Sequence, residues 1–355
     1  MFAASFISLV LASAALAGPM KRDGGLTVNI AGPSDAGSAD DLQFSATIEN
    51  TGSETVKILK YGTILDDLPT RSFKVTKDGE EVSFTGIKAC AAIDLEAAGE
   101  SAYAVIPAGE SITVNHNIGN LFDFATAGAG NFKFEPLTGF QVLGSEEASF
   151  APLEELEVSS NAVEVSVSQL EKQEVPVEKR ATNICPNASQ KSFIDAAYTE
   201  SKQMATAAAN YISSNGANSL YTSYFKTNPT TTIRNVFTSV ANENTSSRTM
   251  DCRDTYSACR SGVIAYAVVA TTNIYFCPIF FNQVPQTRLC GGGTSVAARN
   301  LRGGTMLHEM THAVAGTDDV VYGCAADRGL SAAQQRINAD NYNCFGAEVW
   351  LATRC

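Results

Sequence analysis

Residues 306–323 read MLHEMTHAVAGTDDVVYG, and this stretch restricts the fold more than any other part of the chain. It has helical composition as far as Gly316, a residue type that commonly ends helices. His308 and His312 are four residues apart, so on a helix both imidazoles face one side and can bind a single Zn²⁺ ion. Glu309 lies beside the first of them, where it can act as general base on water attacking a peptide carbonyl and then carry the proton to the leaving amine.

The scarcity of histidine restricts the third metal ligand. The chain has three histidines, and His116 lies in the first half of the sequence, far from the motif. A catalytic zinc ion takes three protein ligands and water, so an acidic side chain must complete the set. No glutamate stands where a thermolysin-like site requires one, which leaves an aspartate as the third ligand. The acidic residues that follow the motif are Asp318, Asp319, Asp327, Asp340 and Glu348.

The stretch after the second histidine resembles a motif of the deuterolysins, the fungal neutral zinc proteases called aspzincins because their third ligand is an aspartate. In this chain it reads GTDDVVYG over residues 316–323. The resemblance implies that Asp319 is the ligand, since Tyr322 follows it by three residues, with Asp318 as the alternative. The connection from the helix is short, so the chain must turn sharply at Gly316.

The resemblance also assigns roles around the metal. It implies that Tyr322 donates a hydrogen bond to the developing oxyanion, and the alternative is a packing role. Asp340 also fits the family pattern and is expected to steady the zinc helix without binding the metal. One zinc ion per chain, and activity on proteins with a preference for basic ones, are implied as well. The family's cysteine spacing implies the disulfides Cys185–Cys252, Cys259–Cys277 and Cys290–Cys355, with Cys324–Cys344 as an additional pair.

Charge and cysteine content divide the chain near residue 180. The first 180 residues carry 26 acidic and 12 basic side chains, whereas the remainder carries 11 and 13. Eight of the nine cysteines follow this point, a density that argues for disulfides in an exported segment. The boundary coincides with the basic pair Lys179-Arg180. We therefore expect cleavage after Arg180, between a pro-segment of residues 18–180 and a catalytic domain of residues 181–355.

Residues 1–17 have the features of a signal peptide. An apolar run over residues 6–12, too short to span a bilayer, leads to a small-residue cleavage site ending at Ala17. No other stretch of the sequence is apolar enough for a membrane anchor. The sequence thus predicts a secreted, extracellular monomer with no membrane or nucleic-acid partner.

Hydrophobic patterning predicts an α+β protein. Residues 25–170 show the apolar–polar alternation of half-buried strands and are expected to form a β-rich, sandwich-like pro-domain. The second part is expected to be a mainly helical, zincin-like domain with a small β-sheet. The expected strands cover residues 26–30, 42–48, 163–167 and 264–275, and the expected helices cover residues 192–213, 306–315 and 331–352, the last capped by Ser331.

Cys90, the one cysteine ahead of residue 180, allows two interpretations. As a lone thiol in the pro-segment it would bind zinc and block the site before activation. Its neighbours form no supporting motif, which favours a buried and unreactive cysteine. Elsewhere, Asn187 and Asn244 each begin a glycosylation sequon.

These features predict a secreted zinc endopeptidase that acts on proteins and peptides. Its own pro-segment would assist folding and delay activity until it is removed. Two alternatives stay open. One is a catalytically silent, disulfide-stapled secreted protein that binds zinc or a partner on the same fold. The other is a zinc hydrolase in which a different acidic residue completes the metal site.

Overall fold

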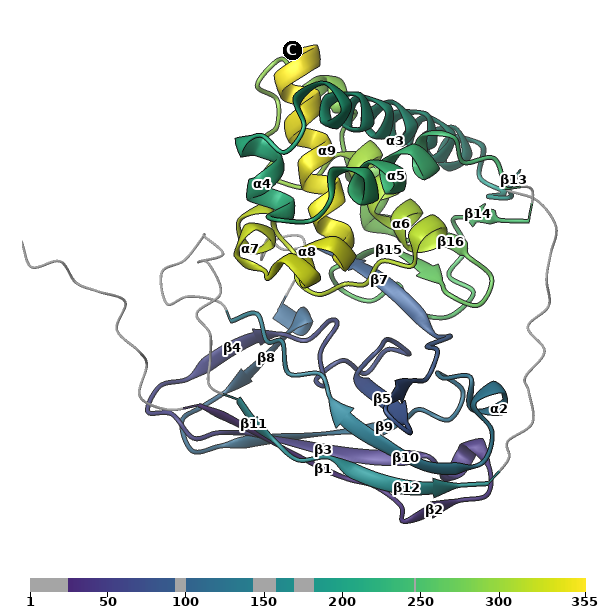
Figure 1. The fold of residues 1–355 in the computed structure, drawn as a ribbon, viewed down its shortest axis with the longest axis vertical. Helices are drawn as coiled ribbons and strands as arrows, with labels where there is room; N and C mark the ends of the chain where they lie inside the picture. Colours follow the sequence, from purple (N-terminus) through teal and green to yellow (C-terminus); the bar gives the residue numbers. More distant parts are fainter. Residues whose placement is uncertain (1–24, 93–99, 143–157, 169–181, 246) are drawn as a thin grey trace, which may run out of the picture.

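The computed structural model describes residues 25–92, 100–142, 158–168, 182–245 and 247–355. The predicted signal peptide and the predicted processing site lie outside these ranges. Figure 1 shows a strand-rich N-terminal region, residues 25–168, beneath a mainly helical C-terminal region, residues 182–355. The α+β class predicted from the sequence is therefore confirmed. Within the described ranges, no helix has both the length and the apolar character needed to cross a membrane.

The N-terminal region consists mainly of two β-sheets. The first has the strand order β11-β1-β3-β9, formed by β11 (Val158–Ser160), β1 (Leu26–Ala31), β3 (Gln43–Asn50) and β9 (Ser111–Asn117). The second has the order β2-β12-β10-β5-β6, formed by β2 (Asp35–Ala36), β12 (Val163–Val167), β10 (Gly130–Pro136), β5 (Phe73–Lys77) and β6 (Glu80–Glu81). The region also contains a separate pair of strands, β4 (Val56–Leu59) and β8 (Tyr103–Ile106), and a short helix, α2 (Phe124–Ala127).

These two sheets share one hydrophobic core, as expected for a sandwich. The ring of Phe44 in β3 lies 5.2 Å from that of Phe73 in β5 and 4.7 Å from that of Phe134 in β10, measured between centroids. Alternate residues of β3 are buried, which is the period that a half-buried strand requires. His116 in β9 belongs to this core, where its Nε2 atom lies 2.9 Å from the carbonyl oxygen of Ile64.

Three helices form the centre of the C-terminal region. In Figure 1, α3, α6 and α9 lie against one another, and α5 packs on α3 and α6. Aromatic rings of Phe225, Phe237, Tyr342 and Phe345 fill the space between the helices. The helices are α3 (Ala188–Asn215), α4 (Ser219–Phe225), α5 (Thr230–Ala241), α6 (Arg302–Ala315), α7 (Cys324–Gly329), α8 (Ala332–Ile337) and α9 (Ala339–Arg354).

A five-stranded sheet joins the two regions. Its order is β13-β14-β16-β15-β7, and the last strand, β7, comes from the N-terminal region. Figure 1 shows β7 directly beneath the helices, apart from the N-terminal sheets. The sequence did not predict that the N-terminal region contributes a strand to this sheet. The strands are β13 (Thr182–Asn183), β14 (Thr249–Asp251), β16 (Asn273–Phe276), β15 (Val263–Val268) and β7 (Ile87–Ala91).

Two predicted elements were wrong in detail. The single helix expected over residues 331–352 is two helices, α8 and α9, separated at Asn338. Asn338 has extended backbone angles, φ −79° and ψ 117°, and its side-chain oxygen accepts hydrogen bonds from the amides of Val320 and Val321. Ser331 caps the short helix α8 only. The single strand expected over residues 264–275 is likewise a hairpin of β15 and β16.

The four expected disulfides are all present. None of them involves Cys90, which is buried and free. The chain therefore has no disulfide between its N-terminal and C-terminal regions, since Cys90 is the only cysteine before residue 180. The bonds join Cys185 to Cys252, Cys259 to Cys277, Cys290 to Cys355 and Cys324 to Cys344.

Candidate metal centre and active site

Helix α6 presents the two histidines and the glutamate from the interior of the molecule. His308 and Glu309 have no exposed surface, and His312 is only 7% exposed. The helix ends where Gly316 adopts the left-handed conformation with φ 66° and ψ 28°. This conformation costs glycine little. It turns the chain back on itself, so that residues 317–319 return to the histidines.

The turn brings three candidate metal donors together. The Oδ1 atom of Asp319 lies 2.8 Å from the Nε2 atom of His308 and 3.2 Å from that of His312. The two Nε2 atoms are 3.1 Å apart. Although burial opposes it, the charges of the two histidines hold the pKa of the Asp319 carboxyl well below its usual range. Two imidazole nitrogens and one carboxylate oxygen are a donor set that fits Zn²⁺.

One of the imidazoles has its orientation fixed on the other side of the ring. The Nδ1 atom of His312 lies 2.7 Å from the carbonyl oxygen of Thr317, to which only a protonated nitrogen can donate. This contact places the proton on Nδ1 and leaves the lone pair of Nε2 facing Asp319.

The other candidate acid points away from the histidines. Asp318 places Oδ1 2.8 Å from the Nζ atom of Lys88, and its Oδ2 atom lies 3.4 Å from Arg71. Its backbone amide donates to the carbonyl oxygen of Ile337 at 2.6 Å, which fixes the register of the segment. Of the two adjacent aspartates, the structure thus brings Asp319 to the histidines and Asp318 to two basic side chains of the N-terminal region.

Glu309 is fully buried beside the three donors. Within the described part of the chain, neither of its carboxylate oxygens has a hydrogen-bond partner. Burial raises the pKa of Glu309 to about 8, and the nearby charge of His308 opposes the rise. A buried carboxylate with free oxygens is suited to accept and return a proton.

Tyr322 lies over the metal-binding residues. Its ring stacks on that of His308, with centroids 6.4 Å apart and an angle of 20° between the planes. Its hydroxyl donates to the carbonyl oxygen of Ala89 at 2.5 Å. Burial raises the pKa of Tyr322 well above its usual value, so the phenol stays protonated and can donate. The side chain of Gln141 holds the backbone of Tyr322, accepting from its amide at 2.8 Å and donating to its carbonyl at 2.7 Å.

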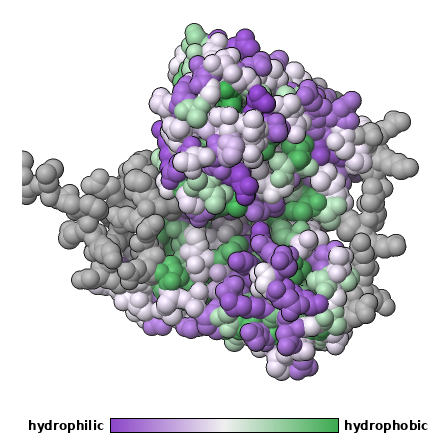
Figure 2. All heavy atoms as spheres, viewed as in Figure 1, coloured by the Kyte–Doolittle hydropathy of each residue, from purple (hydrophilic) through white to green (hydrophobic). Residues whose placement is uncertain are grey.

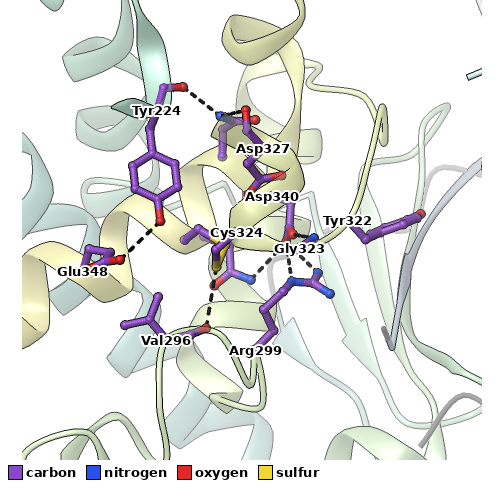
Figure 3. Close-up of a disulfide and its surroundings, with 12 residues drawn as sticks. Tyr224, Val296, Arg299, Tyr322, Gly323, Cys324, Asp327, Asp340 and Glu348 are labelled. Carbon is purple, nitrogen blue, oxygen red and sulfur yellow. Dashed lines mark hydrogen bonds and ion pairs between the residues drawn. A yellow bond between two sulfur atoms is a disulfide. The ribbon is translucent and has the colours of Figure 1, made fainter. Parts of the chain in front are cut away.

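Asp340, at the start of α9, lies behind the donors rather than among them. Its Oδ1 atom accepts from Arg299 at 2.6 Å and lies 3.5 Å from the Nδ1 atom of His308. Its Oδ2 atom accepts from the amide of Gly323 at 2.7 Å. Although burial opposes it, the Arg299 guanidinium lowers the pKa of Asp340 to about 2. Figure 3 shows Asp340 with Arg299 and Gly323, beside the disulfide that includes Cys324.

Sequence reasoning missed three residues around the site: Lys88, Gln141 and Arg299. Arg299 lies in a loop with a positive φ of 48° and belongs to no motif that could have revealed it. Lys88 and Gln141 come from the N-terminal region, more than 160 residues from the residues that they bind. Their position in the predicted pro-segment gave no indication that they contact the metal site.

A helix with the HExxH pattern, closed by a neighbouring aspartate in a mixed α+β protein, is the arrangement of a metallopeptidase. Comparison with known families agrees. The model of the deuterolysin metalloprotease (M35) family matches residues 1–353, and the chain belongs to this family. It is accordingly a metalloendopeptidase, which confirms the predicted class of enzyme.

Curated relatives extend over nearly the whole chain. Penicillolysin from Penicillium citrinum is 28% identical, and the match covers 88% of this chain and 89% of the relative. A neutral protease 2 homolog from Phaeosphaeria nodorum is 30% identical over 96% of each chain. A peptidyl-Lys metalloendopeptidase from Grifola frondosa is 28% identical over 96% of this chain and 97% of the relative.

Proposed function

We propose that this chain is a secreted, zinc-dependent endopeptidase that hydrolyses proteins and peptides, with His308, His312 and Asp319 as zinc ligands. The observation that carries the proposal is the convergence of the two Nε2 atoms and Asp319 Oδ1 within 3.2 Å of one another. Zinc held there supplies a Lewis acid that polarises a carbonyl and acidifies water.

The chain's own residues carry the proton transfers. Glu309 takes a proton from water as the water oxygen attacks the carbonyl carbon of the substrate. It then delivers the proton to the amide nitrogen as the C–N bond breaks, so that an acid and an amine leave the site. The hydroxyl of Tyr322 donates a hydrogen bond to the carbonyl oxygen, on which negative charge develops. Its contact with the Ala89 carbonyl supports this role.

The proposal includes the export and the proteolytic processing expected from the sequence. The signal peptide of residues 1–17 directs export, and cleavage after Arg180 then separates the pro-segment from a mature chain, residues 181–355. Four disulfides within that mature chain support an extracellular setting. The mature chain acts as a monomer and prefers basic proteins as substrates.

Metal analysis and casein hydrolysis by the mature chain test this proposal. We expect one zinc per chain and loss of activity on Glu309→Gln, with zinc retained because Glu309 is not a ligand. Glu348→Gln is the matched control, because Glu348 on α9 pairs with Arg328 on α7 and the substitution should leave activity unchanged. Zinc without activity in the unsubstituted chain would favour the silent binding protein instead. Absence of zinc would contradict the proposed metal site.

A further inference from the structure

Strand β7 occupies the edge of the sheet that borders the metal site. It pairs antiparallel with β15, placing Lys88 opposite Ala267, Ala89 opposite Tyr266 and Cys90 opposite Ala265. Without β7, β15 would be the edge strand of the C-terminal sheet on this side. A free strand edge is a surface to which an extended peptide can add by main-chain hydrogen bonds.

The middle of β7 crosses the proposed catalytic groups. The carbonyl oxygen of Ala89 accepts from the hydroxyl of Tyr322. The Sγ atom of Cys90 lies within 4.8 Å of possible ligand atoms of His308 and Glu309. One peptide bond, Ala89–Cys90, therefore presents its carbonyl to the oxyanion donor and lies beside the general base.

The residues on either side of this bond are anchored in the C-terminal region. The Nζ atom of Lys88 lies 2.8 Å from Asp318 and donates to the carbonyl oxygen of Thr317 at 2.5 Å. On the other side, Arg299 donates to the carbonyl oxygen of Ala91 at 3.2 Å.

Cavities continue the line of the strand at both ends. One of about 360 Å³ is lined in part by Ile87, Lys88 and Asp318, and one of about 1040 Å³ is lined in part by Ala92 and Arg299. The first lies where the two regions meet. Several of the hydrophobic residues visible in Figure 2 gather along that junction. A polypeptide longer than β7 would thus have room along the same path.

We propose that β7 is a built-in substrate mimic, with the Ala89–Cys90 bond in the position of a bond to be cleaved. This inference rests on the proposed function, because it uses the same site. The N-terminal region then inhibits the enzyme by competition, and extended substrates bind β15 in the place that β7 leaves. The amide of Ile87 is bonded to Pro69 and that of Ala92 to Gly262, so both ends of the strand are held and the halves of the bond cannot separate.

A precursor that cannot be processed tests the role of β7. We would express the full chain with Lys179→Ala and Arg180→Ala, load it with zinc and compare its hydrolysis of labelled casein with that of the mature chain. We expect the precursor to be at least about 100-fold less active than the mature chain. Adding Lys88→Glu places a carboxylate against Asp318, and like charges at this distance repel. We expect this precursor to recover about tenfold in activity, equivalent to about 1.4 kcal/mol.

A charge-matched control and a thiol measurement complete the design. Lys133→Glu makes the same change on an exposed pair of the N-terminal region and should leave the precursor inactive. Cys90 is the only free thiol, so a thiol reagent should label it slowly in the parent precursor and rapidly after Lys88→Glu. Lys88→Ala, which removes the charge without adding repulsion, serves if the first variant does not fold.

The outcomes separate this inference from the proposed function. A precursor as active as an active mature chain would overturn the role of β7 alone. So would a Lys88→Glu precursor that exposes Cys90 to the reagent but stays inactive. A mature chain that fails to cleave casein would contradict the proposed function itself, and with it the inference.

Discussion

Asp340 places its Oδ1 atom 3.5 Å from the Nδ1 atom of His308, while the opposite ring nitrogen of the same histidine meets Asp319. The imidazole is thus held between two carboxylates. Arg299 fixes Asp340, donating to its Oδ1 atom from Nη2 at 2.6 Å and from Nε at 3.0 Å. A carboxylate behind a metal-binding histidine orients the ring and raises its basicity.

We therefore predict that Asp340→Asn weakens zinc binding by about 10- to 100-fold without removing a ligand. The substitution keeps the shape of the side chain but removes the charge that Arg299 and His308 face. Competition with a chelator would measure zinc affinity in the mature chain. Asp195→Asn, at an exposed pair with Lys191 on α3, is the control and should leave affinity unchanged. Equal affinities in both variants would show that Asp340 serves packing alone.

Single substitutions of Asp318 and Asp319 should show which of these adjacent residues binds the metal. We expect Asp319→Asn to abolish casein hydrolysis and to lower the zinc content of the mature chain, because a carboxylate ligand is lost. Asp318→Asn should leave zinc in place, since Asp318 faces Lys88 and Arg71. Metal analysis of the two mature variants decides the assignment. A loss of zinc in the Asp318 variant alone would make Asp318 the ligand.

Tyr322→Phe should slow turnover while leaving zinc bound. The phenol is expected to act only as charge develops on the carbonyl oxygen, so its loss should lower kcat by about 10²-fold with little change in KM. Steady-state kinetics of the mature chain, together with thermal unfolding, would check this expectation. A lower melting temperature with unchanged kcat would instead assign Tyr322 a packing role.

The stability of the N-terminal region should depend on pH through Asp66. Burial raises the pKa of Asp66 to about 6, against hydrogen bonds from Thr70 and the amides of Leu68 and Gly62. The folded state then holds a proton that the unfolded state has lost, so stability falls as pH rises from about 4 to above 6. At about 1.4 kcal/mol per pKa unit, the loss is about 3 kcal/mol.

Urea unfolding of the precursor at pH 4.5 and 7.5 would measure this effect. Asp66→Asn should make the free energy of unfolding less dependent on pH, because the amide does not titrate. The neighbouring Asp67, which is half exposed and pairs with Arg260, supplies the control Asp67→Asn. If both variants keep the pH dependence of the parent, Asp66 is not its source.

The residues of the candidate site could be predicted from sequence because they lie close together along the chain. One helical turn relates His308 to His312, and one glycine turn brings back Asp319, so local rules and a family motif were sufficient. The break at Asn338 could not be predicted in this way. Its side chain bonds the amides of Val320 and Val321, and this tertiary contact overrides the helical tendency of the segment.

The pairing of β7 with β15 was also beyond local rules. Cys90 and Ala265 are 175 positions apart, and nothing in the residues around Cys90 marks them as part of another sheet. The favoured interpretation of Cys90 as a buried cysteine agrees with the structure. It is buried beside the histidine and glutamate of the metal site, not within the core of the sandwich.

Because no disulfide joins the two regions, the proposed inhibition by β7 would depend on dilution once the backbone is cut. In the uncut precursor, the covalent connection keeps the local concentration of β7 beside β15 high, whatever the protein concentration. After the proposed cleavage, β7 and β15 would belong to separate molecules, and their pairing would follow mass action. A cut enzyme would then stay inhibited where it is concentrated, near the cell that exports it, and become active as it disperses.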